Sequence, residues 1–257
     1  MQRTTTTSGS DTLPLVVDIP HAGRIYPSDF EPLVEPNAVA LTEDRLVDVL
    51  FAPLMDHARY TTVSRVGRSY LDVNRPRDAG SGVFRRRTLD GRKLQADVGV
   101  DAARKRLTLW DAYHKNVDTA RRRTIAQHGW GVHLNLHSFP STDWHTAGCP
   151  PMPFEIEVGD LNGRTGGRLT RHLVRALHGE GFRVGVNETF KGGEIVRRGR
   201  TEQAIDTIQL EVRRDLYLRD DLYLDWSKMI SSRRRLMRAI FGAVSEAYAQ
   251  PSPQKAA

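Results

Sequence analysis

Hydrophobic positions along the chain follow two spacings, one typical of strands and one typical of helices. Continuous or every-second apolar residues predict strands, whereas apolar residues three and four apart predict helices. A long helix is expected between Asp101, as its N-terminal cap, and Gly129. Further helices are expected at residues 38–59, 166–180 and 225–249, and strands at residues 13–19, 60–66, 69–73, 131–137, 154–158, 182–186 and 207–212.

The alternation of these strands and helices predicts a single α/β domain. Strands separated by helices form a sheet that is covered on both faces. A chain of 257 residues suits one large domain of this kind better than two. We place the domain at residues 13–249, with a disordered Thr- and Ser-rich lead at 1–12 and a frayed tail at 250–257. Residues 77–99 form the longest expected loop, and loops of that length are often functional.

Three polar side chains lie at or near the ends of predicted strands, namely His21, His137 and Glu211. Catalytic groups in open α/β sheets gather at such ends. Two imidazoles and a carboxylate from separate elements match a hydrolytic zinc site, which keeps one position for water. The metal in such sites acidifies the water and polarises the scissile carbonyl, while a nearby carboxylate moves the proton to the leaving nitrogen. The chain has no His-Glu-x-x-His motif, so a structural role for both histidines stays open.

Three further groups suit an anionic substrate. Asn74 and Arg75 follow a predicted strand, and the Arg75 guanidinium suits paired hydrogen bonds to a planar carboxylate. The same residues equally suit a plain turn with Arg75 in solvent. Arg68 is either a group that supports a developing oxyanion or an ordinary surface arginine. The Lys-Gly-Gly segment at 191–193 is either an anion clamp or a simple turn.

The charge of the chain leaves two classes of partner open. The net charge is +7, and runs of three arginines begin at Arg85, Arg121 and Arg233. Such runs are typical of nucleic-acid binding. No nucleic-acid-binding motif accompanies them, and the second and third runs fall in predicted helices. We therefore interpret the runs mainly as solvated surface, and the charge also suits an enzyme with an anionic substrate.

The remaining composition points to a cytoplasmic protein. No apolar run is long enough to span a membrane, and the N-terminus lacks the apolar segment of a signal peptide. Cysteine occurs once, at Cys149, which excludes an intrachain disulfide and fits a reducing compartment. Cys149 lies in a turn-like Gly-Cys-Pro-Pro segment without a base beside it, so we expect a bystander and not a nucleophile. The sequence leaves the oligomeric state open.

Seven segments of the chain together resemble the N-formylglutamate amidohydrolase family. They occur in the order in which that family has them, and they cover roughly residues 13–245. Each is modest alone, whereas seven in order are specific. The segments are Asp18-Ile-Pro-His-Ala-Gly23, Thr42-Glu-Asp-Arg-Leu-Val-Asp48, Arg68-Ser-Tyr-Leu-Asp-Val-Asn-Arg-Pro76, Asn135-Leu-His-Ser-Phe139, Val158-Gly-Asp-Leu-Asn-Gly163, Asn187-Glu-Thr-Phe-Lys-Gly-Gly193 and Ile208-Gln-Leu-Glu-Val-Arg-Arg214.

The resemblance implies a fold, a substrate and a cofactor. The fold would be a three-layer α/β/α arrangement with a central mixed sheet, zinc-carboxypeptidase-like (phosphorylase/hydrolase-like) and shared with aspartoacylase-type enzymes. The substrate would be a small anionic N-acyl amino acid, above all N-formyl-L-glutamate, which water splits into formate and glutamate. One Zn²⁺ per chain would be held by His21, His137 and Asp44, with Glu43 as the reserve choice for the third ligand.

The resemblance also implies roles for the residues around the metal. Glu211 would be the base that activates water, and Arg68 would polarise the substrate carbonyl. Asn74 and Arg75 would hold a substrate carboxylate. The same pocket would be lined by Lys191 and the backbone of Gly192 and Gly193.

This chain departs from the family pattern at two places. Asn135 stands where the family usually has Asp, two residues before His137. A carboxylate beside a ligand imidazole orients it and raises its basicity, so Asn135 is expected to weaken or retune metal binding. The segment around Glu43 and Asp44 also differs from the commoner Thr-Asp-aromatic form. Two alternatives therefore remain: a hydrolase of the same fold with another N-acyl or cell-wall amide substrate, and a non-catalytic basic nucleic-acid-binding domain.

Overall fold

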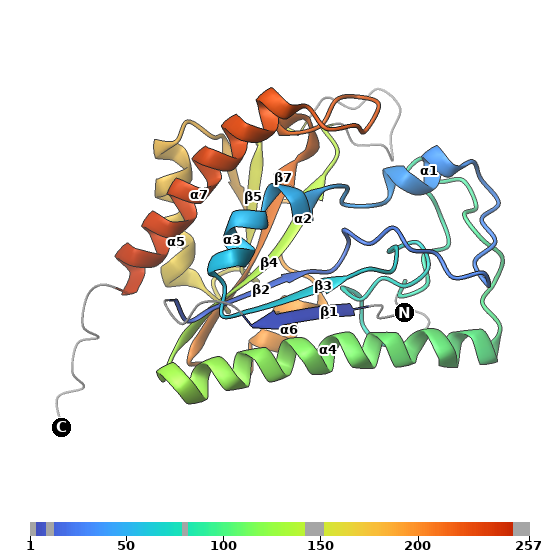
Figure 1. Cartoon of the computed structure of the whole chain (residues 1–257), viewed down its shortest axis with the longest axis horizontal. Coiled ribbons are helices and arrows are strands. Elements are labelled where there is room, and N and C mark those ends of the chain that lie inside the picture. The colour runs from blue at the N-terminus through green and yellow to red at the C-terminus, as the bar shows by residue number, and fades with distance from the viewer. Residues whose placement is uncertain (1–3, 9–12, 79–81, 142–151, 249–257) are drawn as a thin grey trace.

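One mixed sheet of seven strands runs through the centre of the molecule (Figure 1). The computed structural model describes residues 4–8, 13–78, 82–141 and 152–248. The strands are β1 (Thr4–Ser8), β2 (Leu15–Ile19), β3 (Tyr60–Ser64), β4 (Gly131–Phe139), β5 (Ile156–Gly159), β6 (Val184–Val186) and β7 (Ile205–Arg213). They lie in the order β1-β3-β2-β4-β7-β5-β6. β3, β2, β4 and β7 are mutually parallel, whereas β1 and β5 run antiparallel to β3 and β7.

Helices cover both faces of this sheet, which confirms the predicted α/β fold with a mixed central sheet. Figure 1 shows the long α4 on one side of the sheet, and α5 and α7 on the other. No helix within the described ranges is both long and apolar enough to cross a membrane. The helices are α1 (Pro36–Leu41), α2 (Val47–Leu50), α3 (Ala52–His57), α4 (Val100–His128), α5 (Gly167–Gly179), α6 (Glu194–Gly199) and α7 (Trp226–Tyr248), with a 3₁₀ turn η2 at Arg214–Leu216.

The two faces of the central strands differ in chemistry. One face of β4 and β7 joins the main apolar core, which also contains the buried sides of α2, α3, α5 and α7. The strand residues in this core are Val132, Leu134, Leu136, Ile208, Leu210 and Val212. On the other face, beneath α4, lie His133 and Asn135 of β4 and Asp18 of β2, all fully buried. Tyr113 of α4 donates a hydrogen bond of 2.7 Å to the Asp18 carboxylate. The strand alternation therefore separates an apolar core from a buried polar layer.

The predicted helix at 38–59 is wrong as a single element. The chain forms α1, α2 and α3 instead; residues 42–46 separate α1 from α2, and Phe51 separates α2 from α3. Leu46 has a left-handed backbone (φ 58°), which an α-helix does not accommodate. Pro53 lies in the first turn of α3, where its missing N–H costs no hydrogen bond. These interruptions turn the chain so that Asp44 faces the sheet edge.

Three further expectations are corrected in the same way. Residues 69–73 form turns and irregular backbone and not a strand, and the Asp72 carboxylate supports the turn that follows by accepting the backbone N–H of Asn74 at 3.0 Å. Residues 4–8 of the expected disordered lead pair with β3 as an edge strand. The long helix begins at Val100 with Gly99 as its cap, so Asp101 lies in the first turn. Cys149 and the expected tail at 250–257 lie outside the described residues.

The loop at 77–99 packs into the protein. Its described part has only isolated bridges, yet Val83, Phe84 and Leu94 are buried in a second apolar cluster beside α4.

Arg121 of α4, expected on a solvated helix face, is also buried, and its Nε lies 2.8 Å from Glu202. Since a buried guanidinium needs a charged partner, this ion pair explains why Arg121 is placed there.

Two side chains of α4 donate hydrogen bonds to the backbone of the turn at residues 73–75. The indole N–H of Trp110 donates to the backbone oxygen of Arg75 at 2.9 Å, and Nε2 of His114 donates to that of Val73 at 2.8 Å. The two rings stack with centroids 3.7 Å apart. This pair of hydrogen bonds fixes the backbone on either side of Asn74.

The buried His114 should make folding stability depend on pH. Burial lowers its pKa to about 4, whereas an unfolded chain gains the proton near pH 6.5. The stability that neutral His114 contributes is therefore complete above about pH 6.5 and is lost as the pH falls toward 4. We predict that the free energy of unfolding of the parent, relative to His114→Gln, falls by about 2 to 3 kcal/mol between pH 7 and about pH 4.5 in urea titrations.

Thr124→Ala is the control for this comparison. It removes a buried hydrogen bond of 2.9 Å to the backbone oxygen of Ala120, ten residues further along α4, and no titratable group, so its effect on the free energy of unfolding should not vary with pH. A difference between parent and His114→Gln that stays constant over the same pH range would contradict the prediction.

Candidate active site

The carboxyl ends of three adjacent parallel strands bring the predicted polar residues together. β2, β4 and β7 are neighbours in the sheet. His21 follows the end of β2 by two residues, and His137 lies near the end of β4. Glu211 of β7 is the register partner of His137. Parallel strands end at one edge, so residues distant in sequence meet there.

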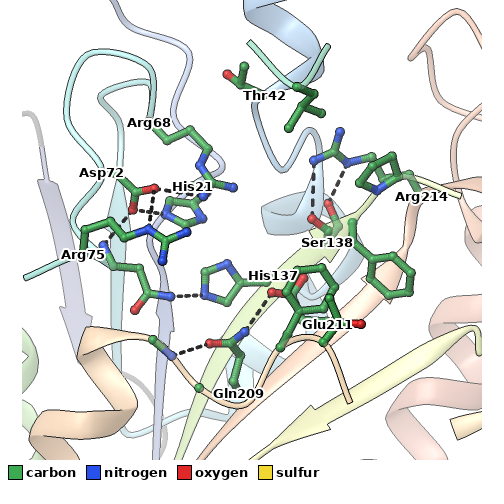
Figure 2. A pocket seen from close by; sticks show the side chains of 18 of the residues that line it. His21, Thr42, Arg68, Asp72, Arg75, His137, Ser138, Gln209, Glu211 and Arg214 are labelled. Atoms are coloured by element: carbon green, nitrogen blue, oxygen red, sulfur yellow. Dashed lines mark hydrogen bonds and ion pairs between the residues drawn. The ribbon is translucent and has the colours of Figure 1, made fainter. Parts of the chain in front are cut away.

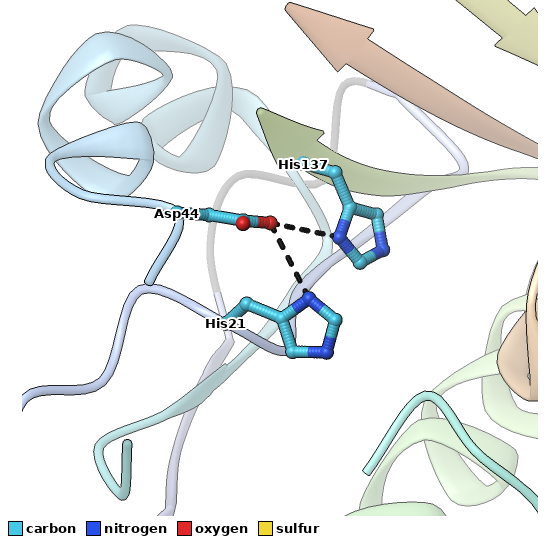
Figure 3. Close-up of side chains that lie close together, drawn as sticks. All are labelled: His21, Asp44 and His137. Atoms are coloured by element: carbon cyan, nitrogen blue, oxygen red, sulfur yellow. Dashed lines mark hydrogen bonds and ion pairs between the residues drawn. The ribbon is translucent and has the colours of Figure 1, made fainter. Parts of the chain in front are cut away.

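His21, Asp44 and His137 form a compact, buried group (Figure 3). One potential ligand atom from each residue lies within 4.8 Å of the other two. The Asp44 Oδ2 atom is 2.9 Å from Nδ1 of His137 and 3.3 Å from Nδ1 of His21. The reserve choice Glu43 is directed elsewhere, because its carboxylate accepts a hydrogen bond of 2.9 Å from Tyr26.

Hydrogen bonds on the far side of each imidazole determine which nitrogen carries the proton. His21 Nε2 lies 2.7 Å from the Asp72 carboxylate, which can only accept, so Nε2 carries the hydrogen. The Nδ1 atom of His21 then has a lone pair, and it has no hydrogen-bond partner among the described residues although it is buried. A buried acceptor without a donor is costly. A bound metal cation would accept the lone electron pair of His21 Nδ1.

Asn135 performs the same task for His137. Its amide nitrogen donates to both oxygens of Asp18, at 3.0 and 3.1 Å, so its carbonyl oxygen faces His137 Nε2 at 2.9 Å. The Asp18 carboxylate accepts further hydrogen bonds from Tyr113 and from His133 Nε2. Asn135 therefore transmits the orientation set by a buried carboxylate one residue further away. In the tautomer that donates the Nε2 proton to Asn135, Nδ1 of His137 has its lone pair toward Asp44.

Three acceptor atoms thus converge, and Asp44 supplies a negative charge among them. Burial raises the pKa of the Asp44 carboxyl, but contacts with His137 and His21 and the nearby Arg68 outweigh burial and hold the pKa well below its usual range. Arg68 and Arg214 lie 3.4 and 3.3 Å from Asp44 Oδ1, whereas Oδ2 faces the histidines and accepts a hydrogen bond of 3.3 Å from the backbone N–H of Ser138. Two imidazole nitrogens and one carboxylate oxygen fit a divalent cation such as zinc.

Glu211 is a buried carboxylate with an unusual pKa. Burial raises its pKa to about 7, and the Asp44 charge acts in the same direction while His137 and Arg68 oppose it. The Gln209 amide donates a hydrogen bond of 2.8 Å to Glu211 Oε1 and fixes the side chain. A carboxylate with a pKa near neutrality can both accept and release a proton.

A cavity of about 390 Å³ opens beside these groups (Figure 2). Five cationic side chains and two carboxylates line it. Its wall includes most residues named from the sequence, but not Asp44, Glu43 or Asn135. The residues named in advance that line it are His21, Arg68, Asn74, Arg75, His137, Lys191, Gly192, Gly193 and Glu211. Lining residues for which the sequence had suggested no role in a site include Asp72, Gln209 and Arg214, and Arg85, interpreted from the sequence as solvated surface, lines the cavity as well.

The Gly-Gly segment allows a close approach of Asn74. A Cβ atom on Gly193 would lie 2.4 Å from the side-chain amide atoms of Asn74. The backbone N–H of Gly193 donates to Gln209 at 3.0 Å, and the Asn74 side-chain oxygen accepts the N–H of Ile195 at 3.1 Å. The absence of a side chain at Gly193 therefore lets Asn74 pack against the start of α6.

Known proteins resemble the chain in sequence and in fold. The family model described as FGase, N-formylglutamate amidohydrolase, matches residues 13–218. The crystal structure of N-formylglutamate amidohydrolase from Ralstonia eutropha JMP134 is similar, with 24% sequence identity, 95% of this chain and 97% of that chain covered, and a TM-score of 0.83. A gene product from Agrobacterium tumefaciens is similar at 14% identity, with 96% of each chain covered and a TM-score of 0.80. No curated protein matches the chain.

Gly193→Ala should disturb the cavity wall through Asn74. The added methyl group overlaps the Asn74 amide, so we predict a loss of about 1 to 3 kcal/mol in the free energy of unfolding, measured by urea denaturation. In an Asn74→Ala background the same substitution should cost much less, because the overlapping atoms are gone. Gly242→Ala is the matched control, since nothing lies within 4 Å of the added atom. Equal costs in the two backgrounds would refute the contact.

Proposed function

The chain belongs to the N-formylglutamate amidohydrolase family, and from this premise we propose that it hydrolyses N-formyl-L-glutamate to formate and L-glutamate with one Zn²⁺ per chain. The observation that carries the proposal is the convergence of His21, Asp44 and His137 within 4.8 Å, beside Glu211 and a cavity with an excess of cationic side chains. The family makes the protein an amidohydrolase. The metal, the substrate and the role of each residue are our proposal.

The ligand set favours zinc. Imidazole nitrogen and carboxylate oxygen are common ligands of catalytic zinc, which keeps a further position for water. His21 and His137 would bind through Nδ1 and Asp44 through Oδ2, because these atoms face one another. When bound, such a cation polarises an amide carbonyl and makes a water molecule more acidic.

Glu211 would transfer the proton. Its carboxylate accepts a proton from water as the water oxygen adds to the formyl carbon, and it then delivers that proton to the amide nitrogen as the C–N bond breaks. The products are formate and the free amino group of glutamate. The raised pKa supports both steps, because a group that titrates near neutrality is an effective base and an effective acid.

Arg68, Asn74 and Arg75 would hold the substrate. Arg68 is fixed by a hydrogen bond of 2.9 Å to Asp72, and it would stabilise negative charge on the carbonyl oxygen. The Asn74 amide nitrogen is 3.1 Å from His137 Nε2, which carries a proton in the tautomer that Asn135 imposes. In that tautomer His137 Nε2 cannot accept the Asn74 amide N–H, so we expect this N–H to donate a hydrogen bond to the substrate. Arg75 is half exposed, which leaves its guanidinium accessible to the α-carboxylate.

The size of the cavity favours a small substrate. A volume of about 390 Å³ lies near the lower end of the range for small-molecule sites. A single N-acyl amino acid suits this volume better than a strand of cell wall does. The five cationic side chains suit a substrate with more than one carboxylate.

The metal and the reaction should be lost together in His137→Ala. We predict about one zinc ion per chain in the parent, by elemental analysis, and formate release from N-formyl-L-glutamate. His137→Ala should lose both, because a ligand nitrogen is removed, whereas exposed His57→Ala should keep both. Stoichiometric zinc in His137→Ala would contradict the ligand assignment. Zinc in the parent with release of a different acid from a panel of N-acyl amino acids would contradict the formyl substrate.

Glu211→Gln should separate chemistry from binding. Since the amide cannot accept the proton from water, we predict that kcat falls by roughly 10²- to 10⁴-fold while zinc content and KM change little. Glu188→Gln removes the same charge from an exposed position and should keep kcat within a few fold. A Glu211→Gln enzyme with nearly full kcat would exclude this residue as the base.

A further inference from the structure

Arg85 lies in the cavity wall, and the reaction proposed above assigns no role to its positive charge. It lines the same cavity as Arg68 and Arg75. Arg68 and Arg75 share the Asp72 carboxylate, at 2.9 and 4.0 Å. For Arg85, in contrast, no carboxylate of the described residues lies within ion-pair distance. Among those residues its guanidinium makes one hydrogen bond, from Nε to the backbone oxygen of Arg87 at 3.0 Å. Its terminal nitrogens are therefore available to a ligand.

The loop around Arg85 holds this side chain in place. The Arg85 backbone oxygen accepts a hydrogen bond of 2.7 Å from the Gln95 amide, and the next residue accepts one of 2.8 Å from the N–H of Leu94. The adjacent Val83 and Phe84 are buried in the apolar cluster beside α4. A loop anchored on both sides of Arg85 limits where the guanidinium can go, which reduces the entropy lost on binding.

The surroundings of Arg85 favour a bound anion. Burial lowers the pKa of its guanidinium to about 10, and the positive charges of Arg68 and Arg75 add to this effect. The group stays protonated at neutral pH, but its charge is incompletely compensated. A carboxylate would compensate it through paired hydrogen bonds.

We propose that Arg85 binds the side-chain carboxylate of the substrate and thereby selects N-formyl amino acids with an acidic side chain. The inference rests on the proposed function, in which Asn74 and Arg75 take the α-carboxylate. Lys191 is the other cation available for this carboxylate, but its side chain is exposed to solvent. Arg85 is partly buried and presents a planar fork, which matches a carboxylate better than an ammonium group does.

Two substrates of similar length separate this role from a general one. N-formyl-L-glutamate carries the second carboxylate, and N-formyl-L-methionine does not. We expect Arg85→Gln to lower kcat/KM for N-formyl-L-glutamate by about 100-fold, mainly through KM. For N-formyl-L-methionine we expect a change of less than about threefold, since the lost contact is absent from that substrate. Arg85→Lys should recover part of the lost affinity, because it keeps the charge without the fork.

Two variants serve as controls. Arg86→Gln removes the same charge from the neighbouring position, where the side chain is exposed and 3.9 Å from Asp97, and it should leave both substrates unaffected. Arg75→Gln should weaken both substrates, since the α-carboxylate is common to them. Thermal unfolding of each variant shows whether the fold is intact.

Three results would overturn the assignment of Arg85. They are an equal loss on both substrates in Arg85→Gln, a selective loss in Lys191→Gln in its place, and a parent that does not prefer the acidic substrate. A parent that releases formate from neither substrate is a distinct outcome. That outcome would contradict the proposed function, and because the inference about Arg85 rests on that function, it would be contradicted as well.

Discussion

The site depends on the meeting of three hydrogen-bond acceptors in a buried place. The Nδ1 atoms of His21 and His137 face the Asp44 carboxylate, and the opposite nitrogen of each imidazole lies within hydrogen-bond distance of an acceptor, Asp72 for His21 and Asn135 for His137. Acceptors gathered out of water without a donor are unfavourable. A divalent cation turns that arrangement into a favourable one, and most of the polar groups nearby serve to keep the three atoms oriented.

The sheet supplies this arrangement through its alternation. Residues on one face of β2, β4 and β7 form the apolar core, whereas the other face carries a buried polar layer that includes Asp18, His133 and Asn135 beneath α4. Asp18 is the centre of that layer, since its carboxylate accepts hydrogen bonds from His133, Asn135 and Tyr113. The Asn135 amide connects this carboxylate to His137. The expectation that Asn135 weakens or retunes the metal site stays a prediction, but the structure places a carboxylate behind it.

The sequence predicts the strands and their ends better than it predicts the third ligand. Alternation is a local signal, so His137 and Glu211 could be placed at strand ends from the residues alone. The turn that carries Asp44 was predicted as helix, because apolar spacing continues across the left-handed Leu46. Arg85 was interpreted as surface because its neighbours in space are far away in the sequence. Only family resemblance pointed to Asp44 before the structure did.

X-ray absorption at the zinc edge tests the central claim most directly, because it reports the atoms around the metal. For the loaded parent protein, the account predicts two imidazole nitrogens at about 2.0 to 2.1 Å and a carboxylate oxygen at about 2.0 to 2.2 Å. Removing the His21 side chain should reduce the imidazole count to one. A sulfur ligand at about 2.3 Å, or an imidazole count that the loss of His21 leaves unchanged, would contradict the account.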